Sequence, residues 1–275
     1  MTHRTKGSRK RKAEDEHDDD STNKKVRKRT NEVFRYDTLP NLSVAEILTA
    51  SRFGMRTVAI SVGSGANQKT FDAHEDLLTS HSDYFRAAVN GSWKEATLRN
   101  VGLDDEDPEA FQVFYKFIYS GSVFSAKEGD HKKKKAASSS ENDDEWKRLA
   151  SCWILGERLL STTFKDAVVD AIIAKHHVKR QYPIGMDIEI YPNSHARSRA
   201  RKLLVDLAVW KWDDQTLEQQ LKEDTSRFEF LYDVAAALGK IRRTGCQGAS
   251  PLDGTTCIYH EHEADGKPCY KTMFR

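Results

Sequence analysis

The sequence predicts an α+β protein in which a small sheet with clustered helices is followed by a mainly helical C-terminal extension. Two observations lead to this fold class. Val58, Ile60 and Val62 alternate with small or polar residues, which is the period of a half-buried strand. Further along the chain, apolar residues recur at intervals of three and four, as on one face of a helix.

Changes in composition divide the 275 residues into four parts. We expect residues 1–38 to be a disordered basic tail, because apolar residues are sparse there. Residues 39–178 form the α+β domain, interrupted by a disordered insert at 127–145 that lacks any large apolar side chain. A mainly helical extension occupies 179–245, and a tail containing Cys and His occupies 246–275.

A short amphipathic helix is expected ahead of the first strand. Ser43 as the N-cap and Glu46 three residues later form a capping box, and Gly54 can end the helix. Its apolar stripe consists of Leu42 just before the cap, then Val44, Ile47 and Leu48.

Helices cluster after the strand and its hairpin partner, which runs through Phe71. Residues 74–90 have a helical pattern with a break near Ser82, and a brief strand at 101–103 precedes a helix that Asp107 caps. The core face of that helix is made by Ala110, Phe111, Phe114, Phe117 and Ile118, and it ends at Tyr119-Ser120-Gly121.

Further stripes follow the insert. Trp146, Leu149, Trp153 and Leu160 begin one helix, and Phe164, Val168, Ala171 and Ile172 continue in a second. Alternation of Ile184, Met186, Ile188 and Ile190 between two prolines predicts a short strand. A helix beginning at Ser198 carries Leu203, Leu207 and Trp210 on one face, and a last stripe contains Leu231, Ala235 and Leu238.

The pattern F-x-x-H-x-x-x-L-x-x-x-S-x-x-F, filled by Phe71, His74, Leu78, Ser82 and Phe85, resembles the BTB/POZ domain. Segments 91–96 and 105–121 are similar to the family's "gsfkEa" turn and its "dDpeaFelflkwlYtG" helix, which ends at Tyr119 and Gly121. The region after Val178 is similar to the C-terminal extension of filamentous-fungal BTB proteins, although Arg199 and Ala200 replace the Pro and Leu of their helix start.

The resemblance implies a protein-interaction module and a BTB/POZ fold. In the family, the residue at His74 caps and packs the helical hairpin, with no catalytic or metal-binding role. Homodimers of the family form through the N-terminal helix and first strand, which here means Leu42, Val44, Ile47, Leu48 and Val58. Many dimeric relatives carry an Asp where this chain has Arg56, so a homodimer and a monomer both stay open.

Protein partners other than a second copy follow from the same resemblance. A cullin scaffold of a ubiquitin ligase, for which the chain would be a substrate adaptor, would contact Tyr84, Phe85 and Tyr119. A corepressor is the alternative partner for a nuclear regulator. We expect no enzyme, since no nucleophile with a base, carboxylate pair or phosphate-binding loop emerges.

The basic tail favours the nucleus, with the cytoplasm as the alternative. Two clusters separated by eleven residues resemble a bipartite signal for an import receptor; they contain Arg9, Lys10, Arg11 and Lys12, then Lys24, Lys25, Arg27, Lys28 and Arg29. Residues 1–31 hold eleven basic and six acidic residues, which leaves 33 basic and 36 acidic residues for the rest. This mildly acidic remainder argues against a nucleic-acid partner, and no apolar run is long enough for a membrane partner.

The C-terminal tail contains the candidate metal ligands Cys246, Cys257, His260, His262 and Cys269. Zinc favours such side chains in tetrahedral sets, and a small tail without its own core benefits from a metal. Paired CxxC or HxxxH spacings are missing, however. We therefore expect no cofactor and prefer packed thiols and surface histidines; a zinc-stabilised, nucleic-acid-associated regulator is the alternative.

Overall fold

A computed structural model describes residues 54–90, 99–127, 144–179, 182–223, 227–245 and 250–274. All of them belong to one unit, Ser51–Arg275, and a second unit comprises Met1–Ala50. The expected basic tail, the amphipathic helix after Ser43, the turn at 91–96, most of the 127–145 insert and Cys246 lie outside the described residues.

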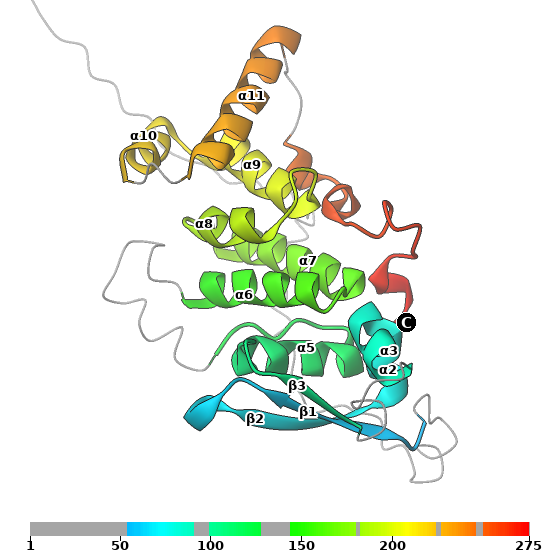
Figure 1. The fold of residues 1–275 in the computed structure, drawn as a ribbon. Coiled ribbons are helices and arrows are strands. Elements are labelled where there is room, and N and C mark those ends of the chain that lie inside the picture. The colour runs from blue at the N-terminus through cyan, green and yellow to red at the C-terminus, as the bar shows by residue number, and fades with distance from the viewer. Residues whose placement is uncertain are drawn as a thin grey trace, which may run out of the picture. The chain divides into compact units, whose positions relative to one another are not determined.

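Within the described residues, the sheet has three strands in the order β2-β1-β3. β1 (Thr57–Val62) pairs antiparallel with β2 (Lys69–His74) and parallel with β3 (Asn100–Leu103). Val58, Ile60 and Val62 are fully buried, which confirms the half-buried strand predicted from the alternation. In Figure 1 the sheet lies on one side, and α5, α6, α7 and α9 follow one another away from it.

Two short helices, α2 (Glu75–His81) and α3 (Asp83–Asn90), replace one long helix, as the break near Ser82 predicted. The Ser82 hydroxyl donates to the Leu159 carbonyl over 2.6 Å and accepts from the Phe85 amide over 3.1 Å. A buried hydroxyl with both partners satisfied joins the start of α3 to the chain just after α6.

α5 (Pro108–Ser120) begins and ends as its sequence predicts. The Asp107 carboxylate accepts from the Glu109 and Ala110 amides, and Pro108 occupies the first turn. Gly121 ends the helix with a φ of 71°, a left-handed conformation that glycine adopts without strain. The expected core residues of this helix are all buried.

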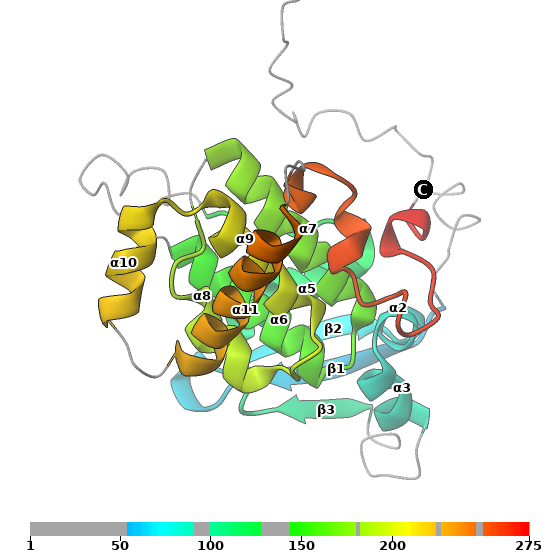
Figure 2. The same ribbon diagram turned by 90° about the horizontal axis from the view of Figure 1, so that it is seen from above.

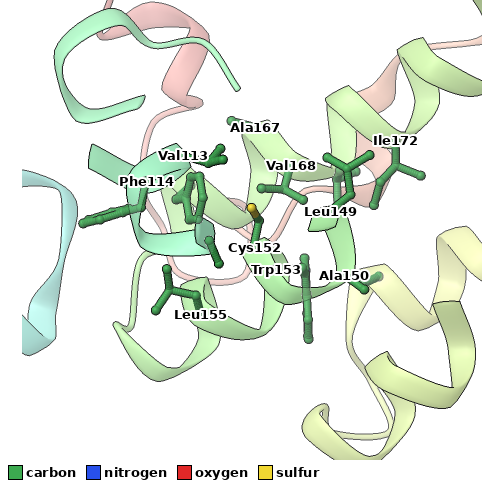
Figure 3. Packing of buried hydrophobic residues seen from close by; sticks show 14 of the residues in the cluster. Val113, Phe114, Leu149, Ala150, Cys152, Trp153, Leu155, Ala167, Val168 and Ile172 are labelled. Carbon is green, nitrogen blue, oxygen red and sulfur yellow. The ribbon is translucent and has the colours of Figure 1, made fainter. Parts of the chain in front are cut away.

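α6 (Asp144–Arg158) and α7 (Thr162–Lys179) pack against α5 to form the centre of the unit. Figure 3 shows Cys152 of α6 pointing toward Val168 of α7, whereas the Trp153 side chain points away from Val168 and Phe114. Burial raises the pKa of the Cys152 thiol to about 12, so this cysteine is a neutral core residue.

The predicted apolar stripe of α6 was wrong at one position. Leu160 is 56% exposed and has a φ of 50°, because the helix ends before it and the chain turns into α7. Leu159 fills the core position instead, with 1% of its surface exposed.

The extension contains α8 (Met186–Ile190), α9 (Arg199–Lys211), α10 (Asp214–Glu223) and α11 (Phe228–Thr244). The predicted strand at 184–190 was wrong, since α8 occupies it. Met186 and Ile190 are buried four residues apart on one helical face, whereas Ile188 is 44% exposed.

α9 and α11 follow their predictions to different degrees. The Ser198 hydroxyl caps α9 by accepting from the Ala200 amide, so the departure from the family's helix start leaves the cap intact. On α11 the buried residues are Phe230 and Val234, while Ala235 and Leu238 are exposed. The predicted face was therefore one residue out of phase.

The C-terminal tail runs over α7 toward α2, as Figure 2 shows. Its described part, residues 250–274, contains the short 3-10 helices η6 (Pro251–Asp253), η7 (Thr256–Tyr259) and η8 (Tyr270–Thr272). Phe274 then packs on Phe117 with ring centroids 5.5 Å apart and lies beside Gly121. None of the described helices has both the length and the apolar composition needed to cross a membrane.

We expect Gly121→Ala to destabilise the protein more than Gly185→Ala. Both glycines have a left-handed φ, 71° and 80°, so each substitution introduces strain of about 1–2 kcal/mol. A Cβ at Gly121 would also lie 2.5 Å from the Phe274 ring, whereas nothing lies within 4 Å at Gly185. Displacing that ring adds about 1–3 kcal/mol, measurable by urea unfolding.

The Phe274→Ala background supplies the control for this comparison. Without the ring, the difference in cost between the two glycine substitutions should become smaller, and what is left comes from the Cβ of residue 274, which lies 2.9 Å from a Cβ at position 121. An equal cost in the wild-type background would contradict the docking of Phe274 beside the end of α5.

Candidate functional site

The predicted dimerisation residues divide between two regions. Leu42, Val44, Ile47 and Leu48 lie outside the described residues. Val58 lies on the central strand with its side chain fully buried, because the even-numbered residues of β1 face the helices. The assignment of Val58 to a partner-binding surface was therefore wrong, and its role is in the core.

The proposed partner surface at Tyr84, Phe85 and Tyr119 also needs one correction. Phe85 is fully buried and stacks on Phe114 with ring centroids 6.3 Å apart, so it cannot contact a partner. Tyr84 and Tyr119 are half-buried. Of the three predicted residues, Tyr84 and Tyr119 therefore retain surface for an interaction.

His74 occupies the N-cap position of α2, but its side chain makes no capping hydrogen bond. Its Nδ1 lies 2.8 Å from the Tyr119 hydroxyl, and the backbone amide of His74 donates to the same hydroxyl over 3.2 Å. The remaining motif residues pack the core, with Leu78 fully buried and Phe71 against Phe111. His74 thus ties the hairpin to the end of α5.

Arg56 is engaged within its own chain. Its guanidinium lies 3.6 Å from the carboxylate of Glu75, a residue only 6% exposed, and Arg99 pairs with the same carboxylate. A buried carboxylate requires such compensation. Arg99 and the more exposed Arg56, which stands at the place of the family's Asp, therefore neutralise Glu75 together.

Four of the five predicted metal ligands come together in the tail. One ligand atom from each of Cys257, His260, His262 and Cys269 lies within 4.8 Å of the others. Cys269 Sγ is 3.7 Å from His260 Nδ1, and both cysteines are free. His260 is fully buried, which corrects the expectation of surface histidines. Burial raises the pKa of Cys269, with Cys257 adding to the shift.

Asp170 of α7 forms hydrogen bonds with His260 of this cluster and with its neighbours in the tail. It accepts from His260 Nε2 over 3.0 Å, from the Tyr270 hydroxyl over 2.6 Å and from Lys271 Nζ over 2.8 Å. Burial alone would raise the pKa of Asp170, but these hydrogen bonds and one from Thr256 outweigh it and lower the pKa. Asp170 is therefore an ionised acceptor.

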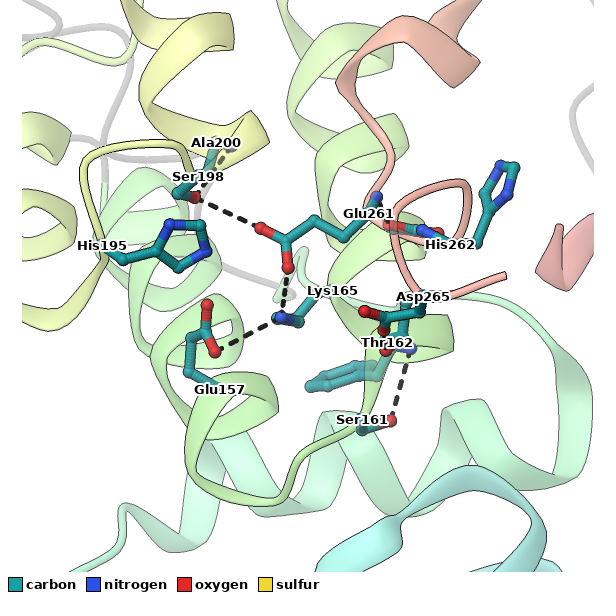
Figure 4. A network of polar contacts seen from close by, with 12 residues as sticks. Glu157, Ser161, Thr162, Lys165, His195, Ser198, Ala200, Glu261, His262 and Asp265 are labelled. Atoms are coloured by element: carbon teal, nitrogen blue, oxygen red, sulfur yellow. Dashed lines mark hydrogen bonds and ion pairs between the residues drawn. The ribbon is translucent and has the colours of Figure 1, made fainter. Parts of the chain in front are cut away.

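A second network joins the tail to α6, α7 and the start of α9 (Figure 4). Lys165 Nζ lies 2.5 Å from Glu261 and 3.3 Å from Glu157, and Glu261 also accepts from the Ser198 hydroxyl. Burial would lower the pKa of Lys165, but the two carboxylates outweigh it and raise the pKa. His195 lies close to Glu157 and Glu261, and these three side chains could in principle hold a metal ion. Lys165, however, already provides the positive charge between the two glutamates.

The sequence reasoning missed Asp166 and Asp170. Asp166 is 1% exposed and accepts from the backbone amides of Glu261 and His262, over 2.7 Å and 3.3 Å. Its pKa is raised, because burial outweighs these hydrogen bonds. Two aspartates four residues apart in the otherwise apolar stretch 166–174 were the available signal, since residues at this spacing lie on the same face of a helix.

A groove in the extension was also missed. It has a volume of about 640 Å³ and is bordered by Ile188 and Phe228, which are 44% and 73% exposed. Its floor contains the buried Arg227–Asp187 pair, with Nε and Oδ2 2.6 Å apart. Phe228 and Tyr232 stack beside it, with ring centroids 6.4 Å apart.

His81 lies where the tail meets the α2–α3 hairpin. The ring stacks on Phe274 at 5.2 Å and meets Phe117 edge-on at 5.6 Å, while Nδ1 is 3.2 Å from the Thr163 hydroxyl. Burial lowers the pKa of His81 from 6.5 to about 4. The adjacent cavity is bordered by Arg86, Lys267 and Asp83, and both cations pair with Asp83.

We expect His81 to make the protein less stable in mild acid. Between pH 6.5 and about 4 the unfolded chain binds a proton at this residue that the folded chain does not. The contribution of His81 to the free energy of unfolding is therefore fully present above pH 6.5. It declines as the pH falls, by about 2 kcal/mol between pH 7 and pH 5.

Urea unfolding at pH 7 and pH 5 measures this effect in the wild type and in His81→Phe, which keeps a ring between Phe117 and Phe274. In the His81→Phe variant, the difference in unfolding free energy between pH 7 and pH 5 should be smaller by about 2 kcal/mol. The control His195→Asn, at an exposed histidine, should keep the wild-type difference. An unchanged pH dependence in His81→Phe would contradict the assignment.

Comparison with known proteins gives matches to part of this chain. A profile of the BTB/POZ domain matches residues 53–139. The protein named Armadillo BTB Arabidopsis protein 1, from Arabidopsis thaliana, is 32% identical over 91 residues, which cover 33% of this chain and 12% of that protein. BTB/POZ domain-containing protein 9 of Drosophila melanogaster is 40% identical over 57 residues, 20% of this chain and 8% of that protein.

The matched segments thus span about a tenth of the length of these relatives. The profile match contains β1 to β3, the α2–α3 hairpin and α5, which are the elements that carry the BTB motif. The two relatives come from a plant and an insect, and the resemblance of the extension to fungal proteins stays a prediction.

Proposed function

Because this chain contains a BTB/POZ domain, which is a protein-interaction domain, we propose that it is a non-enzymatic scaffold that oligomerises through that domain. The match at 53–139 carries the proposal. The His74 side chain is consistent with a structural use of the motif, because its ring contacts the Tyr119 hydroxyl inside the domain.

The N-terminal apolar stripe is the proposed contact between two copies. Val44, Ile47 and Leu48 precede β1 by about ten residues, and the described core beneath β1 is already filled by its own side chains. A symmetric interface would bury the same stripe from both chains. Arg56 already neutralises Glu75, so the interface would depend on apolar burial rather than on the family's charged contact.

We expect Ile47→Asp in the full chain to convert a dimer into a monomer. A carboxylate in an apolar interface has to be desolvated without a partner, which costs several kcal/mol. Thr49→Asp is the matched control, since it adds the same charge off the stripe. Light scattering at a series of concentrations gives the mass of each protein.

A truncation starting at Gly54 tests the same segment. It keeps the hydrogen bond from the Gly54 amide to Asp76 and the Arg56–Glu75 ion pair, so β1 and α2 retain their contacts. The truncated chain is expected to be a monomer. A wild-type chain that is itself monomeric at all concentrations would rule out the homodimer and leave a heterologous partner.

Residence in the nucleus is part of the proposal, supported by the two basic clusters of the tail. Replacing Lys24, Lys25, Arg27 and Lys28 by Ala in the full chain is expected to lower the nuclear fraction of a fluorescent fusion several-fold. The matched control replaces Lys132–Lys135, which removes the same charge from the insert. Equal loss in both variants would point to net charge rather than to an import signal.

A cullin adaptor and a corepressor-recruiting regulator remain predictions from the family resemblance. Tyr84 and Tyr119 are the half-buried residues through which either partner could act. A nucleic-acid-associated regulator has less support, because the residues after position 31 carry more acidic than basic side chains.

A further inference from the structure

The Cys and His cluster of the tail has the composition and spacing of a tetrahedral zinc site. Zinc–sulfur bonds of about 2.3 Å and zinc–nitrogen bonds of about 2.0 Å place neighbouring ligand atoms about 3.3–3.8 Å apart. Cys269 Sγ and His260 Nδ1 are already separated by 3.7 Å, and all four ligand atoms lie within 4.8 Å of one another. Shifts of about 1 Å would complete the tetrahedron.

His260 is oriented as a zinc-binding histidine should be. The Asp170 carboxylate is an acceptor, so Nε2 carries the proton of the 3.0 Å hydrogen bond and Nδ1 presents its lone pair to the cluster. A carboxylate behind a ligating imidazole fixes the tautomer and the ring orientation. Because His260 is fully buried, this orientation is held by packing as well.

His262 supplies an independent observation. Its Nε2 is buried and has no hydrogen-bond partner among the described residues, while its backbone amide is held by Asp166. Buried polar atoms without a partner are rare and require an explanation. A metal ion beside this ring would satisfy the nitrogen without any change in the course of the backbone.

The charges and the location agree with a structural ion. Two thiolates from Cys257 and Cys269 neutralise a divalent cation, and two sulfurs with two imidazoles favour zinc over harder ions. The ligands come from η7, the loop after it and the residue before η8, a segment whose buried apolar side chains are few. Binding energy there becomes folding energy for the tail.

We propose that Cys257, His260, His262 and Cys269 bind one structural zinc ion that crosslinks the C-terminal tail, while the hydrogen bond between His260 and Asp170 connects this site to α7. The site does not depend on oligomerisation of the BTB domain. It uses no ligand from Cys246, the fifth candidate of the sequence pattern, which lies outside the described residues.

The test uses the full chain, purified without chelators and with reductant, and measures bound zinc by mass spectrometry. One zinc per chain is expected, and it is lost in Cys257→Ser and Cys269→Ser but kept in the matched control Cys246→Ser. Replacement of zinc by cobalt should give the charge-transfer and d–d absorption of a tetrahedral site with thiolate ligands. A wild-type chain without metal, and without this cobalt spectrum, would overturn the proposal.

Asp170→Asn separates ligation from simple packing. The amide keeps the size of the side chain but weakens the support of His260, so zinc affinity should fall about 10–100-fold in a chelator competition. An unchanged affinity, or zinc retained by both cysteine variants, would place the ion elsewhere.

Misfolding of a cysteine variant does not remove the test, because the wild type can be examined alone. Chelation of zinc should increase hydrogen exchange in residues 255–274 and lower the thermal midpoint, and added zinc should restore both. Identical exchange with and without chelator would contradict a structural role.

Discussion

Two carboxylates on α7, the buried Asp166 and the partly buried Asp170, hold the C-terminal tail in place. Asp166 accepts the backbone amides of Glu261 and His262, and Asp170 accepts hydrogen bonds from His260, Tyr270 and Lys271. Removing either carboxylate would leave buried donors unpaired, at about 1–3 kcal/mol each. The path of the C-terminal tail depends on this helix face.

From that anchor the tail contacts both halves of the folded unit. Glu261 bonds to Lys165 of α7 and to Ser198 at the start of α9, so the extension is attached to the domain through polar contacts. Phe274 reaches His81 and Gly121 at the other end. The extension and the BTB/POZ elements are thereby packed around the same helix, and the zinc site would lie at the centre of this connection.

Local patterns predicted those elements whose cause is local. The period-two alternation in β1 and the Asp107–Pro108 start of α5 were sufficient, because burial and capping act within a few residues. The 184–190 segment was misassigned because alternating apolar residues fit a strand and the i, i+4 face of a short helix equally well. Val58 and Phe85 were placed on surfaces because a sequence pattern does not show which face the core covers.

The convergence of the candidate metal ligands also could not be predicted from local sequence patterns. The spacing of Cys257, His260, His262 and Cys269 matches no paired knuckle, and their convergence depends on a fold of the tail that Asp166 and Asp170 impose from ninety or more residues away. Native-state hydrogen exchange in increasing denaturant tests this account most directly. Peptides from α5, α9 and the tail should open in one cooperative transition with the same free energy; opening of α9 and the tail at clearly lower denaturant than α5 would contradict the single unit.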